Sequence, residues 1–251
     1  YSNYGELNRQ LTEKAARIRR LEQAAAGQRK EAERLKQSVV AKEREILEFV
    51  RNRIRLKVLN YQMEQRFREA DALIEAKKKE FPQLAEWLTE KAEENRFLGR
   101  IGNLLTDSGT RFAGYPLAGP EKRSILNING GTISYKDSLG RTFLKEWKEF
   151  QPRTLYRLLQ NDSAMRRNPK AAEAGCELLQ KRLGAACKKN PGDRELSAVA
   201  AVYADNKMEQ LKYASSADPE GTKESVREFL RSMEGAGDYR KLEQELSPLL
   251  R

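Results

Sequence analysis

The sequence predicts a mainly α-helical protein with a long N-terminal coiled-coil helix, a small three-stranded antiparallel β meander and C-terminal helical hairpins. An apolar heptad runs in one register through the first third of the chain, a short β-rich segment follows, and helical spacing then returns. The expected parts are a coiled-coil rod at 1–81, a second helix at 82–106, a linker loop at 107–124, a β module with its following helix at 125–161, and a helical tail at 162–251.

The heptad predicts a helix from about Ser2 to Glu80 that needs a partner helix. A spacing of 3.5 residues held this long makes a seam that an isolated helix cannot bury, and it favours a left-handed supercoil. We expect a dimer of this chain, with parallel pairing favoured over antiparallel pairing and neither excluded. The predicted oligomer seam consists of Leu7, Leu11, Ile18, Leu21, Leu35, Val39, Ile46, Phe49, Leu56, Met63, Phe67 and Ile74.

The strength of this seam varies along the rod. Lys14, Gln28 and Lys42 occupy core positions in its first half, where polar groups specify register at a cost in stability. A second apolar stripe from Leu47 to Tyr61 widens the face, so we expect contact there with more than one neighbour. The charges expected to govern partner choice are Arg17, Glu22, Glu31, Glu45, Lys57 and Glu64.

Pro82 interrupts the helical pattern because it has no amide hydrogen, and it is predicted to begin a second helix that ends near Leu105. The heptad continues in frame through this point, so a kinked continuation competes with a fold-back. We favour the fold-back because it would cover the extra stripe at 58–74. The glycines and prolines of 106–124 predict a linker loop.

Three β-rich runs, at 125–128, 132–135 and 142–144, are separated by an Asn-Gly-Gly turn and by a second turn containing glycine. So few residues bury little surface by themselves. We therefore expect Trp147 and Phe150 to pack the sheet against the flanking helices.

The tail predicts helices at 152–161, 169–189, 194–215, 219–233 and 239–250, separated by turn and capping residues. Paired helices with short connections suggest hairpins similar to tetratricopeptide repeats. Cys176 and Cys187 would lie on one continuous helix, about 16 Å apart along its axis. This is too far for a disulfide, so both are predicted to be small buried apolar residues.

The chain contains no histidine. This excludes the Ser-His-Asp triad, the Cys-His pair and histidine-based metal sites. Glycine-rich phosphate loops and the nucleophile-elbow motif are also missing from the sequence. We therefore expect no enzymatic activity, no cofactor and no metal.

The formal net charge is +11, with the basic excess in the rod and the middle segment and a neutral tail. Such an excess is compatible with nucleic acid as an alternative partner. The candidate anion contacts are Arg51, Arg53, Arg55 and Lys57. These side chains wrap around a helix rather than share one face, so ion pairs with neighbouring glutamates are the favoured interpretation.

The first residue is Tyr rather than Met, so we expect the chain to be a fragment or processed form of a longer protein. It contains neither a long apolar run nor a signal peptide, which predicts a soluble fragment without a membrane span. A membrane anchor upstream of Tyr1, and the cellular compartment, are left open.

Residues 125–159 resemble small β modules in the C-terminal accessory regions of bacterial multidomain, protein kinase-like proteins, where a tetratricopeptide-like helical tail can follow. The matching residues are Gly131, Gly140, Trp147, Phe150, Pro152 and Leu155. The chain has no HRD, DFG or VAIK-like kinase motif. The resemblance implies an accessory region downstream of a catalytic domain, and it assigns no site residue.

The sequence therefore predicts a non-enzymatic coiled-coil scaffold or regulatory region that oligomerises through its rod and presents a compact body for protein–protein interaction. The alternative is a nucleic-acid-binding protein that uses the basic rod and the middle segment. An enzyme relying on Asp, Glu, Lys, Tyr or Ser is a third hypothesis.

Overall fold

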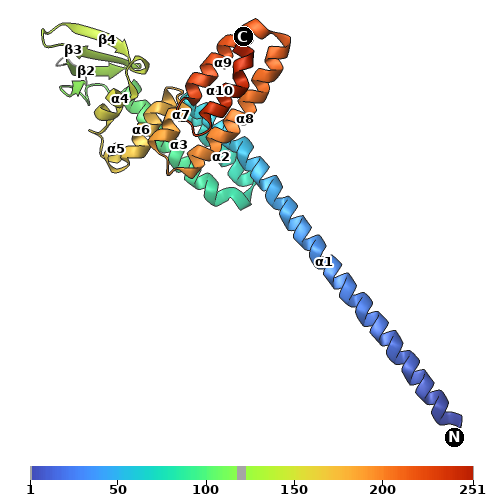
Figure 1. Cartoon of the computed structure of the whole chain (residues 1–251). Helices are drawn as coiled ribbons and strands as arrows, with labels where there is room; N and C mark the ends of the chain where they lie inside the picture. The colour runs from blue at the N-terminus through green and yellow to red at the C-terminus, as the bar shows by residue number, and fades with distance from the viewer. Residues whose placement is uncertain (1, 118–122, 251) are drawn as a thin grey trace. The chain divides into compact units, whose positions relative to one another are not determined.

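The computed structural model describes residues 2–117 and 123–250, except for the side chains of residues 2–5 and 7. The chain is mainly α, as predicted, and it divides into two units, Tyr1–Arg51 and Asn52–Arg251 (Figure 1). We call the second unit the body. The helices are α1 (Ser2–Met63), α2 (Phe67–Glu80), η1 (Pro82–Leu84), α3 (Ala85–Thr106), η2 (Trp147–Glu149), α4 (Pro152–Leu159), α5 (Ser163–Arg167), α6 (Pro169–Leu179), α7 (Leu183–Lys189), α8 (Arg194–Ala217), α9 (Pro219–Met233), α10 (Tyr239–Leu246) and η3 (Ser247–Leu250).

The predicted N-terminal helix is present, but it ends at Met63 rather than at Glu80. Gln65 adopts a left-handed backbone with φ of 60°. Its amide donates to the carbonyl of Gln62, and the amide of Arg66 donates to the carbonyl of Tyr61. These two bonds form a Schellman motif, which terminates a helix by satisfying its last carbonyls.

Helix α3 folds back along α2, so Pro82 begins a turn and does not merely kink a continuing helix. The side-chain amide of Asn95 donates to the Phe67 carbonyl at 2.9 Å and to the Asp71 carboxylate at 2.8 Å. Gly102 leaves room for the Phe67 ring, because a Cβ there would come within 2.8 Å of it. The start of α2 is thus held against the second half of α3.

The β meander forms as predicted and gains one short strand. The strands are β1 (Pro116–Leu117), β2 (Arg123–Asn129), β3 (Thr132–Lys136) and β4 (Thr142–Glu146), all antiparallel in the order β1-β2-β3-β4. Gly130 and Gly131 close the β2–β3 hairpin with φ of 55° and 81°. A two-residue turn with positive φ at both positions matches the strand twist, which explains the two glycines.

The sheet shares one core with the helices of the body. Ile125, Ile128 and Ile133 are fully buried, and they belong to the same apolar cluster as Leu155 of α4. Trp147 and Phe150 are buried in this cluster, as the sequence predicted. Because the sheet is small, its stability depends on this contact with the helices.

The tail is helical, but the expected helix at 169–189 is wrong because it is divided into α6 and α7. Lys181 has φ of 60°, and the amides of Lys181 and Arg182 donate to the carbonyls of Leu178 and Glu177. This is a second Schellman motif. Cys176 and Cys187 therefore lie on different helices, both as free thiols.

Candidate functional site

The predicted seam is an exposed apolar stripe over the described part of residues 1–51. Its side chains are between 55% and 63% exposed, and the side chain of Leu7 lies outside the described residues. The exposed seam residues are Leu11, Ile18, Leu21, Leu35, Val39, Ile46 and Phe49. A regular row of large apolar side chains in water is the characteristic of a surface that meets a partner.

The later seam residues lie in the body and pack within this chain. Met63 is 8% exposed and Ile74 is fully buried, while Leu56 and Phe67 are partly buried. Assigning Met63, Phe67 and Ile74 to an intermolecular seam is therefore wrong, because this chain itself already buries Met63 and Ile74 and partly buries Phe67. The sequence pattern could not distinguish a helix of the same chain from a helix of another.

The four candidate anion contacts do not form one basic surface. Arg55 is 7% exposed and ion-paired with Glu195, so it is not available to a phosphate. Arg51 pairs with Glu48 at 3.0 Å, as the favoured interpretation expected. Arg53 and Lys57 are exposed.

Glu195 of α8 contacts α3 and the part of α1 that belongs to the body. Arg55 donates to its two carboxylate oxygens at 3.1 and 2.8 Å, Trp87 Nε1 donates at 3.1 Å, and Lys91 Nζ lies 3.6 Å away. Burial alone would raise the pKa of Glu195, but the hydrogen bonds from Arg55 and Trp87 outweigh it and lower this pKa to about 2. The cluster is an ion-pair network that fixes the helices to one another.

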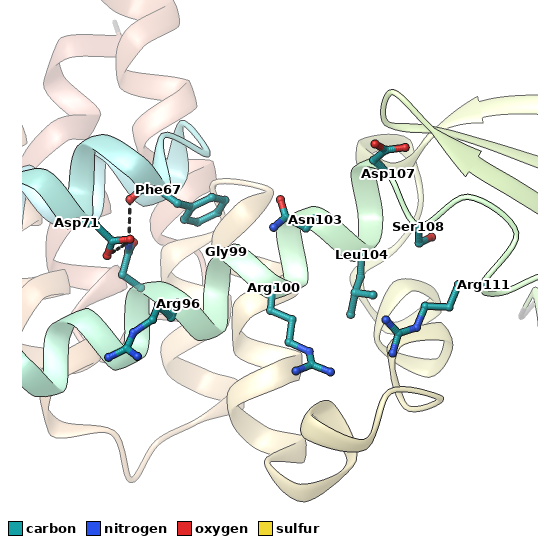
Figure 2. A pocket seen from close by; sticks show the side chains of 11 residues that line it. Phe67, Asp71, Arg96, Gly99, Arg100, Asn103, Leu104, Asp107, Ser108 and Arg111 are labelled. Carbon is teal, nitrogen blue, oxygen red and sulfur yellow. Dashed lines mark hydrogen bonds between the residues drawn. The ribbon is translucent and has the colours of Figure 1, made fainter.

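A cleft of about 710 Å³ lies in the body, lined by α2, α3 and the loop that follows α3 (Figure 2). Phe67 and Leu104 supply apolar surface, and Arg96, Arg100 and Arg111 supply guanidinium groups. Arg96 and Arg100 share one face of α3 because they are four residues apart. The cleft thus combines apolar surface with clustered hydrogen-bond donors.

A buried carboxylate, Asp162, holds two of these arginines together. The Nη2 atoms of Arg100 and Arg111 both lie 2.7 Å from its Oδ2 atom, and its other oxygen accepts hydrogen bonds from the amides of Ala164 and Met165. Burial opposes ionisation of Asp162, yet the bonds from Arg100 and the Ala164 amide lower its pKa below the ordinary value. Asp162 is therefore a charged anchor for both guanidiniums.

The sequence did not reveal this arginine pair. Asp162 precedes a short helix, and its capping role could have been read from that position. However, Arg100 lies 62 positions before Asp162 in the sequence, and Arg111 lies 51 positions before it. No local sequence pattern signals ion pairs over such separations.

Among the residues that the structure describes, no group of His, Cys, Asp and Glu could hold a metal ion, and no helix is long and apolar enough to cross a membrane. Comparisons with protein-family models, curated proteins and solved structures gave no match.

Proposed function

We propose that this chain is a non-enzymatic scaffold that self-associates through the N-terminal part of α1 and carries the body as a surface for protein–protein interaction. The observation that carries this proposal is the row of seam residues from Leu11 to Phe49, each more than half exposed. Burying each methylene group contributes about 0.8 kcal/mol, so pairing two such rows supplies the driving force for association.

A second copy of this chain fits the seam by charge. In a parallel, in-register coiled coil, a flanking residue of one helix meets the residue five positions later on the other. Arg17 then meets Glu22 of the second copy, and Glu31 meets Lys36. Both contacts join opposite charges, which supports parallel pairing.

The seam itself is tested by two adjacent valines. Val39 lies in the seam and is 55% exposed, whereas Val40 lies outside it and is 39% exposed. We expect Val39→Glu to shift the chain from dimer to monomer at tens of micromolar, because it places a charge in the core. Val40→Glu, the matched control, leaves the dimer intact. Light scattering measures the mass, and a monomeric unsubstituted chain at this concentration would refute the proposal.

The pairing direction is tested by exchanging charges. Arg17→Glu and Glu22→Arg each place like charges together in a parallel dimer, and each should weaken dimerisation by about 1 kcal/mol, or about fivefold. The double variant restores the attraction only if the helices are parallel. In an antiparallel pair these two positions do not face each other, so the double variant would remain weakened. Sedimentation equilibrium at low salt provides the dissociation constants.

A further inference from the structure

We propose that the cleft along α3 binds a small molecule carrying a phosphate group, held by Arg100 and Arg111. This inference is independent of self-association, since every lining residue belongs to the body.

The arginine pair is preorganised and retains unused donors. Each guanidinium offers five N–H groups, and Asp162 takes one hydrogen bond from each. Their side chains are 47% and 52% exposed, while Asp162 is fully buried. Two positive charges on one carboxylate leave a net positive charge on this part of the cleft lining. A phosphate, with three oxygens and nearly two negative charges, suits paired guanidiniums.

Further groups extend the site beyond the pair. Asn103 projects from α3 into the same cleft (Figure 2). The Ser108 hydroxyl oxygen is buried and has no hydrogen-bond partner among the described residues. Buried hydroxyls normally have a hydrogen-bond partner. An oxygen of a bound ligand would supply one for Ser108.

The apolar part of the ligand has its own surface. Phe67 and Leu104 line the cleft, and the Phe67 ring packs over Gly99 of α3. The volume of about 710 Å³ lies within the range of about 300 to 1,000 Å³ typical of small-molecule sites. The cleft can therefore hold an organic group as well as its phosphate.

The charges of the cleft favour a small ligand over a nucleic acid. Asp71 and Asp107 also line it, so a chain of successive phosphates would meet carboxylates beside the arginine pair. A ligand with one phosphate end avoids this repulsion. Its hydroxyl or amine groups could instead donate to the two aspartates.

Calorimetric titration of the full chain with phenyl phosphate tests the proposal, with benzoate as a carboxylate of similar shape. We expect phenyl phosphate to bind with a dissociation constant of about 1 mM or lower, and benzoate to bind more weakly. Arg100→Gln and Arg111→Gln should each weaken phenyl phosphate binding by about 10- to 100-fold. Arg153→Gln, an exposed arginine of α4 outside the cleft, should leave binding unchanged.

Loss of Arg100 also deprives a buried carboxylate of one partner, so thermal unfolding of each variant is measured in parallel. Arg100→Lys keeps the charge beside Asp162 but loses the guanidinium fork, and we expect it to fold and bind weakly. Absence of phenyl phosphate binding to the unsubstituted chain overturns the proposal. The proposal is also overturned if benzoate binds as tightly as phenyl phosphate. It is overturned as well if the Arg100→Lys and Arg111→Gln variants fold and bind phenyl phosphate as tightly as the unsubstituted chain.

Discussion

At the scale of single residues, the body relies on a few polar groups that are fixed by packing. Glu195 shows this most clearly, because one carboxylate accepts hydrogen bonds from Arg55 of α1 and Trp87 of α3. Removing one member of such a cluster leaves the others desolvated and without a partner. These residues therefore contribute to stability through their mutual arrangement.

Glu195→Gln should lower the free energy of unfolding by about 1 to 3 kcal/mol at neutral pH. The low pKa of Glu195 also predicts a pH dependence. Its contribution is complete above the ordinary value of 4.5 and is lost as the pH falls towards 2. In urea unfolding, the free energy of unfolding should fall less between pH 7 and pH 3 for the Glu195→Gln variant than for the unsubstituted chain.

The control for this prediction is Glu220→Gln, since Glu220 pairs with Lys223 on the surface with its side chain 83% exposed. It should change stability little. Equal pH dependence of the Glu195→Gln variant and the unsubstituted chain would contradict the assigned role of Glu195.

Gly184 supplies a second prediction at this scale. A Cβ at this position would lie 2.2 Å from the Met233 carbonyl oxygen and 2.8 Å from the Ala236 amide. Because these are backbone atoms, they cannot move aside as a side chain could. Gly184→Ala should lower the free energy of unfolding by about 1 to 3 kcal/mol. At Gly192, leaving aside its two chain neighbours, no described atom lies within 4 Å of the place that a Cβ would take. Gly192→Ala should therefore change the free energy of unfolding little in the same denaturant titration.

At the scale of elements, two helix ends share one device. Gln65 and Lys181 both adopt positive φ at the position where a Schellman motif usually has glycine. The left-handed conformation costs a side-chain-bearing residue about 1 to 2 kcal/mol. Packing of the following helices offsets this cost, and the Arg66 guanidinium lies 4.9 Å from the Tyr61 ring across the first of these ends.

Gln65→Gly and Lys181→Gly should each raise the free energy of unfolding by about 0.5 to 1 kcal/mol, because glycine adopts this backbone without strain. The increase is smaller than the strain itself, since glycine also gains freedom in the unfolded chain. Lys57→Gly, at an exposed position inside α1, should instead lower stability by about 1 kcal/mol. Urea titration distinguishes the two signs, and a loss of stability at Gln65 would refute the interpretation.

At the scale of the whole molecule, the chain has one unit with little apolar burial of its own and one unit with an extensive core. The large apolar side chains of the seam from Leu11 to Phe49 lie in solvent, whereas the body buries most of its own in one cluster. The two units should therefore respond differently to protein concentration, because association stabilises only the unit that it buries.

Thermal unfolding should show two transitions. The midpoint temperature of the N-terminal unit should rise with protein concentration, and that of the body should not. Leu155→Ala removes a fully buried side chain of α4, and it should lower the stability of the body by about 2 to 5 kcal/mol without weakening the dimer. Val39→Glu should instead weaken the dimer without lowering the stability of the body. Circular dichroism at two concentrations separates the transitions, and loss of the dimer in a folded Leu155→Ala variant would contradict this division.

The sequence predicted the elements whose signals are local. The heptad predicts α1, and the Asn129-Gly130-Gly131 turn predicts the hairpin, because each pattern depends on neighbours along the chain. The ends at Met63 and Leu179 were missed, since the residues with positive φ there are Gln and Lys rather than Gly. The short strand β1 also lacks a local signal, as it has only two residues.

By itself, the sequence determined that this chain is mainly α, that its first helix carries an apolar seam, and that these 251 residues contain no histidine. Only the tertiary structure decided which part of the seam is covered within the chain, since apolar spacing is the same whichever helix provides the cover. It likewise brought Arg100 and Arg111 to one carboxylate. Burial in a common core sets such pairings, and no spacing along the sequence encodes them.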